Sequence, residues 1–90
     1  REEWIYFVGA GAGHPIKIGR AVSLPKRLGE LQVGNHYALA VIAAYQTWNG
    51  VAEERRVHTL FAEHSIRGEW FSPHPDILAE IERLANPVRP

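Results

Sequence analysis

Six polar residues scattered along the chain are of the types that cleavage of a phosphodiester bond requires. In chain order they are Tyr6, Lys17, Arg27, Glu54, His58 and Glu69. Phosphoryl transfer needs a cation for the developing charge, a group that takes a proton from water, and a carboxylate that holds a hard metal ion. Each role has a candidate, and the elements that carry these residues decide whether they can meet.

The first two candidates lie on runs that are typical of β-strands. Residues 4–8 are aromatic and β-branched, and residues 16–19 alternate isoleucine with lysine and glycine. Glycines separate the two runs, and Pro15 restarts the chain in an extended conformation. We therefore expect a hairpin in which Tyr6 and Lys17 share one face. A neighbouring lysine would favour ionisation of the tyrosine, although an ordinary cross-strand pair explains the spacing equally well.

A first helix should carry the arginine. Ser23 can cap this helix and Gly34 can end it. Arg27 then lies at the flank of the leucine stripe, where a guanidinium must snorkel, pair with an acid or bind an anion. A long apolar stretch over residues 37–48 predicts a third strand in the centre of the sheet.

Two further helices and a short extended segment complete the prediction. A helix that begins at Asn49-Gly50 places Glu54 and His58 one turn apart on one face. This pair suits a proton acceptor, and a pair on the helix surface is an equally good interpretation. A short extended piece over residues 69–71 holds Glu69 in surroundings that suit Mg²⁺ with several retained waters, although a surface glutamate at a strand end explains it too.

A last helix is predicted with Ser72 as its cap and Pro73 at its first position. The resulting order is β-β-α-β-α-α. Such an order indicates a single α+β domain over residues 1–90 with a small, mainly antiparallel sheet.

Composition restricts the classes of function. Ninety residues form one domain with room for a shallow site. Without cysteine, the chain has neither a disulfide frame nor a thiolate zinc site. No apolar stretch reaches the roughly 20 residues of a membrane span, so we expect no membrane partner and an intracellular, cytoplasmic protein. Because the chain begins without Met, we also expect a module cut from a longer protein with other domains.

The distribution of charge favours a local site for nucleic acid. The formal net charge is +0, which argues against binding through the overall field. Four cations nevertheless lie close together without an intervening acid, and they are candidates for nucleic-acid binding: Lys17, Arg20, Lys26 and Arg27. A solvated helix start is the alternative explanation.

Six segments agree in order and interval with the motifs of a known family. They are Trp4-Ile5-Tyr6, Lys17-Ile18-Gly19-Arg20, Arg27-Leu28, Leu31-Gln32-Val33-Gly34-Asn35, Glu54 to His58, and Glu69-Trp70-Phe71. On these residues the chain resembles the GIY-YIG endonuclease superfamily, in particular its short phage-type branch whose second motif reads KIG. The resemblance implies a three-stranded antiparallel sheet flanked by helices, and metal-dependent hydrolysis of phosphodiester bonds in nucleic acid.

The resemblance also implies roles for individual residues. Glu69 would hold one Mg²⁺ or Mn²⁺, Arg27 would stabilise the pentacovalent phosphate, and Tyr6 would help activate or position the attacking water. His58 is the other candidate proton acceptor, because neutral imidazole exists at pH 7. Lys17 stands where the wider family has its second tyrosine, and it could bind a phosphate oxygen or lower the pKa of Tyr6.

These observations lead to an endonuclease that acts on DNA as the main hypothesis. The alternative is a catalytically inactive nucleic-acid-binding module of the same fold, in which the basic edge persists without turnover. A protein-interaction domain is a weaker third interpretation. It predicts no affinity for DNA at any salt concentration, whereas the other two predict salt-sensitive binding.

Overall fold

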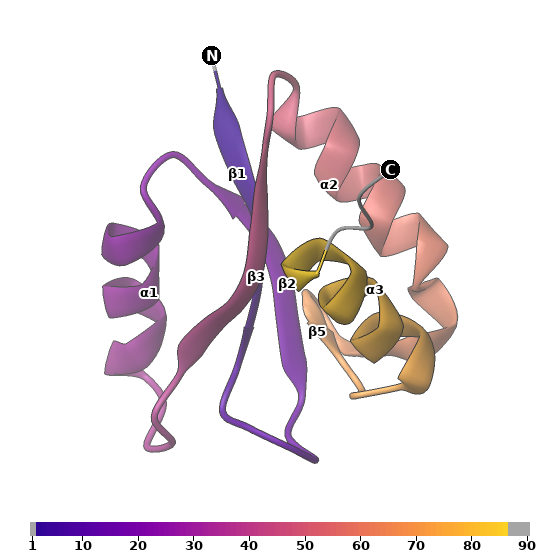
Figure 1. The fold of residues 1–90 in the computed structure, drawn as a ribbon. Helices are drawn as coiled ribbons and strands as arrows, with labels where there is room; N and C mark the ends of the chain where they lie inside the picture. The colour runs from indigo at the N-terminus through magenta and orange to yellow at the C-terminus, as the bar shows by residue number, and fades with distance from the viewer. Residues whose placement is uncertain (1, 87–90) are drawn as a thin grey trace.

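An antiparallel sheet lies between one helix on one side and two helices on the other (Figure 1). The computed structural model describes residues 2–86. Their elements are β1 (Glu3–Gly9), β2 (Ile16–Ala21), α1 (Leu24–Val33), β3 (Ala40–Thr47), α2 (Gly50–Leu60), a 3₁₀ turn (Ala62–His64), β4 (Ser65–Arg67), β5 (Trp70–Phe71) and α3 (Pro75–Ala85). The α+β class is confirmed. The five strands in the order β3-β1-β2-β5-β4 correct the expected three-stranded sheet.

Strand β1 has apolar side chains on both faces and lies inside the sheet. Phe7 packs on the side of α2 and α3, whereas Tyr6 and Val8 pack on the side of α1 against its leucines. Strand β3 is an edge strand, so the prediction that residues 37–48 form the central strand is wrong. The physical reason is the difference in burial, because β1 is buried along residues 5–9 while β3 has only exposed and partly exposed positions.

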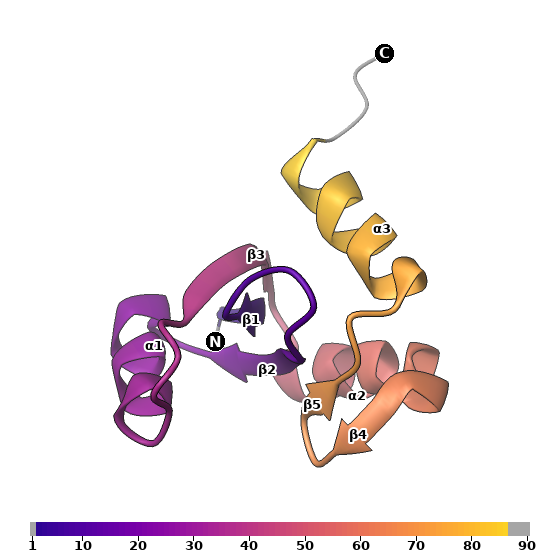
Figure 2. The ribbon, with the colours of Figure 1, turned by 90° about the horizontal axis from the view of Figure 1, so that it is seen from below.

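The two short strands at the other side of the sheet differ in how well the sequence indicated them. The extended piece expected at residues 69–71 is present as β5, which pairs with Ile16 and Lys17 of β2. Strand β4 was not predicted, because its three residues are all exposed and form too short a run to indicate a strand. Gly68 has a φ of 57°, the left-handed conformation that lets the chain turn between β4 and β5. Figure 2 shows this hairpin beside β2 and next to α2.

Helix starts agree with the local capping signals except in the last helix. The Ser23 side chain accepts a hydrogen bond from the first turn of α1, as predicted. Helix α2 begins at Gly50, as expected, and the Asn49 side chain caps it. Helix α3 begins at Pro75 with His74 as its cap, two residues later than the expected Ser72 cap. The Ser72 backbone N–H instead donates to the carbonyl oxygen of His64 at 2.8 Å, which keeps the chain beside the β4 segment. Within residues 2–86, no helix is both long enough and apolar enough to cross a bilayer.

A hydrogen-bonded network ties α2 to β3. The Tyr45 hydroxyl donates to Glu53 at 2.7 Å, and Arg56 donates to the same carboxylate at 3.0 and 2.8 Å. Arg56 first, and Tyr45 second, lower the pKa of Glu53 from its ordinary 4.5 to about 2. Burial and the Glu53 carboxylate together raise the pKa of Tyr45.

Replacement of Glu53 by glutamine should therefore destabilise the domain in a pH-dependent way. A lowered folded-state pKa contributes stability above pH 4.5 that disappears as the pH falls through about 2. We expect Glu53→Gln to lower the free energy of unfolding at neutral pH by about 1–2 kcal/mol, and the deficit to shrink towards zero in acid. Urea unfolding across this pH range measures it, with the exposed Glu82→Gln as control. A deficit that is constant in pH would contradict the assignment.

Candidate functional site

The β1–β2 pairing places two predicted site residues on one face of the sheet. Tyr6 lies opposite Gly19, and Val8 lies opposite Lys17. Because residues two apart on a strand share a face, Tyr6 and Lys17 both lie on the side that α1 covers. The predicted hairpin and shared face are confirmed.

Gly19 provides the space in which the site forms. A Cβ at this position would lie 2.5 Å from the hydroxyl oxygen of Tyr6 and 3.2 Å from Oε1 of Glu69. The phenol and the carboxylate thus converge over a residue that has no side chain. Any larger residue at position 19 would displace the Tyr6 hydroxyl.

The Tyr6 hydroxyl is buried beside the Arg27 guanidinium. The residue is 1% exposed, and no group within residues 2–86 meets its oxygen with hydrogen-bond geometry. Burial raises the pKa of Tyr6, the nearby Arg27 guanidinium opposes this shift, and the carboxylates of Glu69 and Glu54 add to it. The group that opposes the shift is thus Arg27, whereas the sequence had suggested Lys17 for this effect.

Lys17 faces Glu69 and Trp70 instead. Its Nζ lies 3.3 Å from Oε1 of Glu69, and the lysine side chain is 15% exposed while the glutamate is 41% exposed. The same Nζ lies 5.3 Å from the centre of the Trp70 ring, which is within range of a cation–π interaction. The lysine charge is thus neutralised by the carboxylate that the sequence suggested as a metal ligand.

Glu69 is held in place through its backbone. Its carbonyl oxygen accepts a hydrogen bond from the Ile18 N–H at 3.0 Å. Ile18 directly follows Lys17, the last residue of β2 that pairs with β5. The Glu69 carboxylate is partly exposed, so a hydrated ion can reach it. Mg²⁺ is commonly bound by one or two carboxylates and keeps several waters, so this carboxylate could serve as one ligand of that ion.

Arg27 enters the site from α1. Its Nε pairs with Oε1 of Glu30 at 3.0 Å, and its side chain is 41% exposed. Of the three possibilities that the sequence left open for Arg27, the structure shows pairing with an acid. The guanidinium remains partly exposed, so it can also contact an anion.

His58 approaches β2 from α2, which covers the opposite side of the sheet from Tyr6 and Lys17 (Figure 1). Its Nε2 lies 2.7 Å from the carbonyl oxygen of Ile18, the residue whose N–H binds Glu69. A carbonyl oxygen can only accept, so Nε2 carries the proton in the neutral ring and Nδ1 carries the lone pair. The imidazole also contacts the Phe71 ring with centroids 5.2 Å apart, which fixes its orientation.

The remaining basic candidates do not join this group. Arg20 follows Gly19 and so points to the opposite face, where it pairs with Glu3 at 3.0 Å and Glu54 at 3.6 Å. Lys26 is exposed at the start of α1. Their proposed contacts with nucleic acid stay predictions.

One polar cluster was missed by the sequence analysis. Ligand atoms of His64, His74 and Asp76 lie within 4.8 Å of one another. The two imidazoles stack with centroids 3.7 Å apart, Asp76 contacts both, and Nδ1 of His74 accepts from the Asp76 N–H. These contacts fix the start of α3. The 3₁₀ turn that precedes β4 and the start of α3 at Pro75 bring these three residues together. Their spacing along the sequence follows no helix or strand period, so the sequence did not indicate the cluster.

The unpartnered hydroxyl leads to a prediction about stability. Replacement of Tyr6 by phenylalanine removes a buried polar atom that has no partner, so we expect the free energy of unfolding to stay unchanged or to rise by about 1 kcal/mol. Urea unfolding measures this change. Tyr45→Phe is the matched control, because that hydroxyl donates to Glu53 and its loss should destabilise. A Tyr6→Phe variant that is clearly less stable would show that the hydroxyl has a partner.

Comparison with known proteins identifies the family. The chain matches the T5orf172 domain over residues 3–86. This match corrects the resemblance to the GIY-YIG superfamily and its phage-type branch, because the T5orf172 domain is a distinct domain, although both are found in nucleases. No curated protein matches the chain, and no solved structure does. The chain thus belongs to the T5orf172 domain family, whose association with nucleases indicates a function related to nucleic acid.

Proposed function

We propose that this domain is a metal-dependent endonuclease that hydrolyses phosphodiester bonds in nucleic acid, with DNA as the expected substrate. The observation that carries the proposal is the convergence of Tyr6, Lys17, Arg27 and Glu69 around Gly19. A buried phenol oxygen without a partner is costly, and such costs persist where a ligand supplies the missing contact. The family's association with nucleases supports the same conclusion.

Two cations bind the phosphate in this proposal. The terminal nitrogens of Arg27 contact the phosphate oxygens in a planar, charge-assisted arrangement. Lys17, at the opposite side of Gly19, binds a further phosphate oxygen. Both groups stabilise the charge that develops in the transition state.

Glu69 is the residue that would hold Mg²⁺ or Mn²⁺. When bound, such an ion neutralises charge on the phosphate and lowers the pKa of a coordinated water. The Ile18 N–H fixes the Glu69 backbone at 3.0 Å, so the carboxylate is presented from a positioned element. This positioning favours a bound ion over a freely moving surface glutamate.

The two groups suggested for proton transfer take different roles. The raised pKa of Tyr6 keeps its phenol protonated at neutral pH, so this hydroxyl donates a hydrogen bond that positions water or a phosphate oxygen. His58 accepts the proton, because its Nε2 is committed to the Ile18 carbonyl and its Nδ1 lone pair remains.

A nucleic-acid-binding module without turnover is the second candidate. The Lys17–Glu69 ion pair favours it, since Nζ at 3.3 Å occupies the carboxylate in place of a metal ion. This alternative predicts salt-dependent binding of nucleic acid that remains intact.

The experiment that separates the two is cleavage of labelled single- and double-stranded DNA with Mg²⁺, Mn²⁺ or EDTA. We expect Glu69→Gln to reduce the metal-dependent rate by about 100-fold or more while DNA binding changes only a few-fold. Glu63→Gln, an exposed glutamate in the 3₁₀ turn, is the matched control and should cleave like the wild type. If the wild type binds DNA and leaves it intact with every metal, the binding module is the correct function.

A second prediction concerns the arginine. Arg27→Lys keeps the charge but loses the planar fork, so we expect the cleavage rate to fall about 10- to 100-fold with a small change in affinity. Lys26→Gln, at the exposed neighbouring position, should leave the rate at saturating DNA unchanged and should lower the salt slope of binding by about one. Equal effects of the two changes on rate would show that Arg27 does not contact the transition state.

A further inference from the structure

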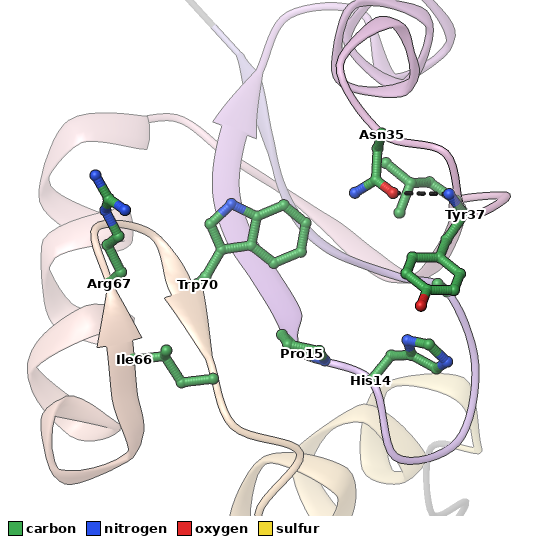
Figure 3. A pocket seen from close by; sticks show the side chains of 9 residues that line it. His14, Pro15, Asn35, Tyr37, Ile66, Arg67 and Trp70 are labelled. Carbon is green, nitrogen blue, oxygen red and sulfur yellow. Dashed lines mark hydrogen bonds between the residues drawn. The ribbon is translucent and has the colours of Figure 1, made fainter.

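A cavity opens beside the candidate site, between the β1–β2 loop, the segment after α1 and the β4–β5 hairpin (Figure 3). Its volume is about 360 Å³, which lies in the range of small-molecule sites. The side chains that define its chemistry are His14, Asn35, Tyr37, Ile66, Arg67 and Trp70. None of these side chains has a role in the proposed catalysis.

The cavity and the candidate site share a wall. Trp70 lines the cavity, and its ring lies 5.3 Å from Nζ of Lys17, which pairs with Glu69 at 3.3 Å. A strand whose phosphate contacts Lys17 would therefore carry a base past the face of Trp70. This continuity connects the cavity to a nucleotide next to the reacting phosphate.

Aromatic rings border the cavity from opposite sides. Figure 3 shows Trp70 on one side and Tyr37 with His14 on the other. Tyr37 is 50% exposed. Its ring makes a T-shaped contact with His14 at a centroid distance of 4.7 Å and a tilted contact with His36 at 4.5 Å. Exposed aromatic faces of this kind bind unpaired bases by stacking.

The wall that carries Tyr37 is already in place before any ligand binds. The Gln32 side chain donates to the carbonyl oxygens of Asn35 and Tyr37 at 2.9 and 2.8 Å, and it accepts from the Leu39 N–H at 2.8 Å. A loop that is held in this way loses little entropy on binding. The geometry is therefore that of a preformed pocket.

Asn35 supplies directed polar groups. Its Oδ1 accepts from the Tyr37 N–H at 2.9 Å, so the amide nitrogen lies on the side of Trp70, as Figure 3 shows. Two N–H donors thus face the cavity and can bind the carbonyl or ring nitrogen of a base. Arg67, which lines the cavity beside Trp70, adds a cation that can bind an adjacent phosphate.

We propose that this cavity binds one unpaired nucleobase of the substrate strand, next to the phosphate held at Lys17. The base stacks between Trp70 and Tyr37, and Asn35 donates to its edge. A base inside a duplex must leave its stack to enter, so the domain prefers single strands or unpaired positions. The inference rests on the proposed nucleic-acid function, and it adds a substrate preference to it.

The test measures binding and cleavage separately. Single-stranded oligonucleotides that each lack one base are bound to the Glu69→Gln variant, and affinity is followed by fluorescence anisotropy. We expect one missing base to weaken binding about tenfold. In the Tyr37→Ala variant the same missing base should change affinity less than twofold. Tyr37→Phe, which keeps the ring, and Trp48→Ala, an exposed aromatic outside the cavity, should keep the tenfold effect.

A second measurement uses the intact cavity, so that a misfolded variant cannot decide the result. 2-Aminopurine at the same position should be quenched on binding, because its fluorescence falls when the base stacks. The inference would be overturned if all the abasic strands bound with equal affinity and 2-aminopurine were not quenched. It would also be overturned if an apolar peptide occupied the cavity and nucleotides did not displace it.

Cleavage by the wild type separates the two proposals. Metal-dependent cleavage of every strand without any position-dependent binding would overturn the base pocket alone and leave the nuclease in place. Position-dependent binding without cleavage would support the pocket and overturn the catalytic proposal.

Discussion

The pairing of Tyr6 with Gly19 is the constraint on which the rest of the site depends. The antiparallel register of β1 and β2 fixes this pair, and a shift by one residue would turn Tyr6 to the opposite face of the sheet. Because Gly19 has no side chain, the Tyr6 hydroxyl and the Glu69 carboxylate approach the same point of β2. The leucines of α1 cover this face, and they bring Arg27 to the edge of the same region.

The shortness of β5 has two consequences for the site. Its ladder with β2 covers only Ile16 and Lys17, so the Ile18 backbone is the next point of attachment. The N–H of Ile18 donates a hydrogen bond to the Glu69 carbonyl oxygen, and the Ile18 carbonyl oxygen accepts one from Nε2 of His58. A longer β5 would take both groups into the sheet and would cover the edge at Gly19. The end of this strand therefore anchors two site residues and leaves the site accessible.

Local sequence signals predicted the elements that carry the site, and tertiary pairing decided the rest. The hairpin, the Ser23 and Asn49 caps and the extended piece before Phe71 follow from turn and capping chemistry. Strand β4 and the edge position of β3 depend on competition among strands for burial, which no local pattern expresses. The raised pKa of Tyr6 depends on burial under α1, which the residue types alone could not reveal. The family was misassigned from short motifs, whereas the match that corrects it covers residues 3–86.

The two cations of the site are paired with carboxylates, in keeping with the net charge of +0 of the chain. Lys17 and Arg27 each face a carboxylate at 3.3 and 3.0 Å, so their charges are oriented but balanced in the free domain. On the proposed function, a phosphate that binds Lys17 competes with Glu69 for the ammonium group and releases the carboxylate for a cation. Binding of phosphate and availability of Glu69 are then coupled, and each favours the other. On the same proposal, the cations become available to phosphate as the carboxylate turns to a metal ion, and cleavage would be restricted to strands that are already in place.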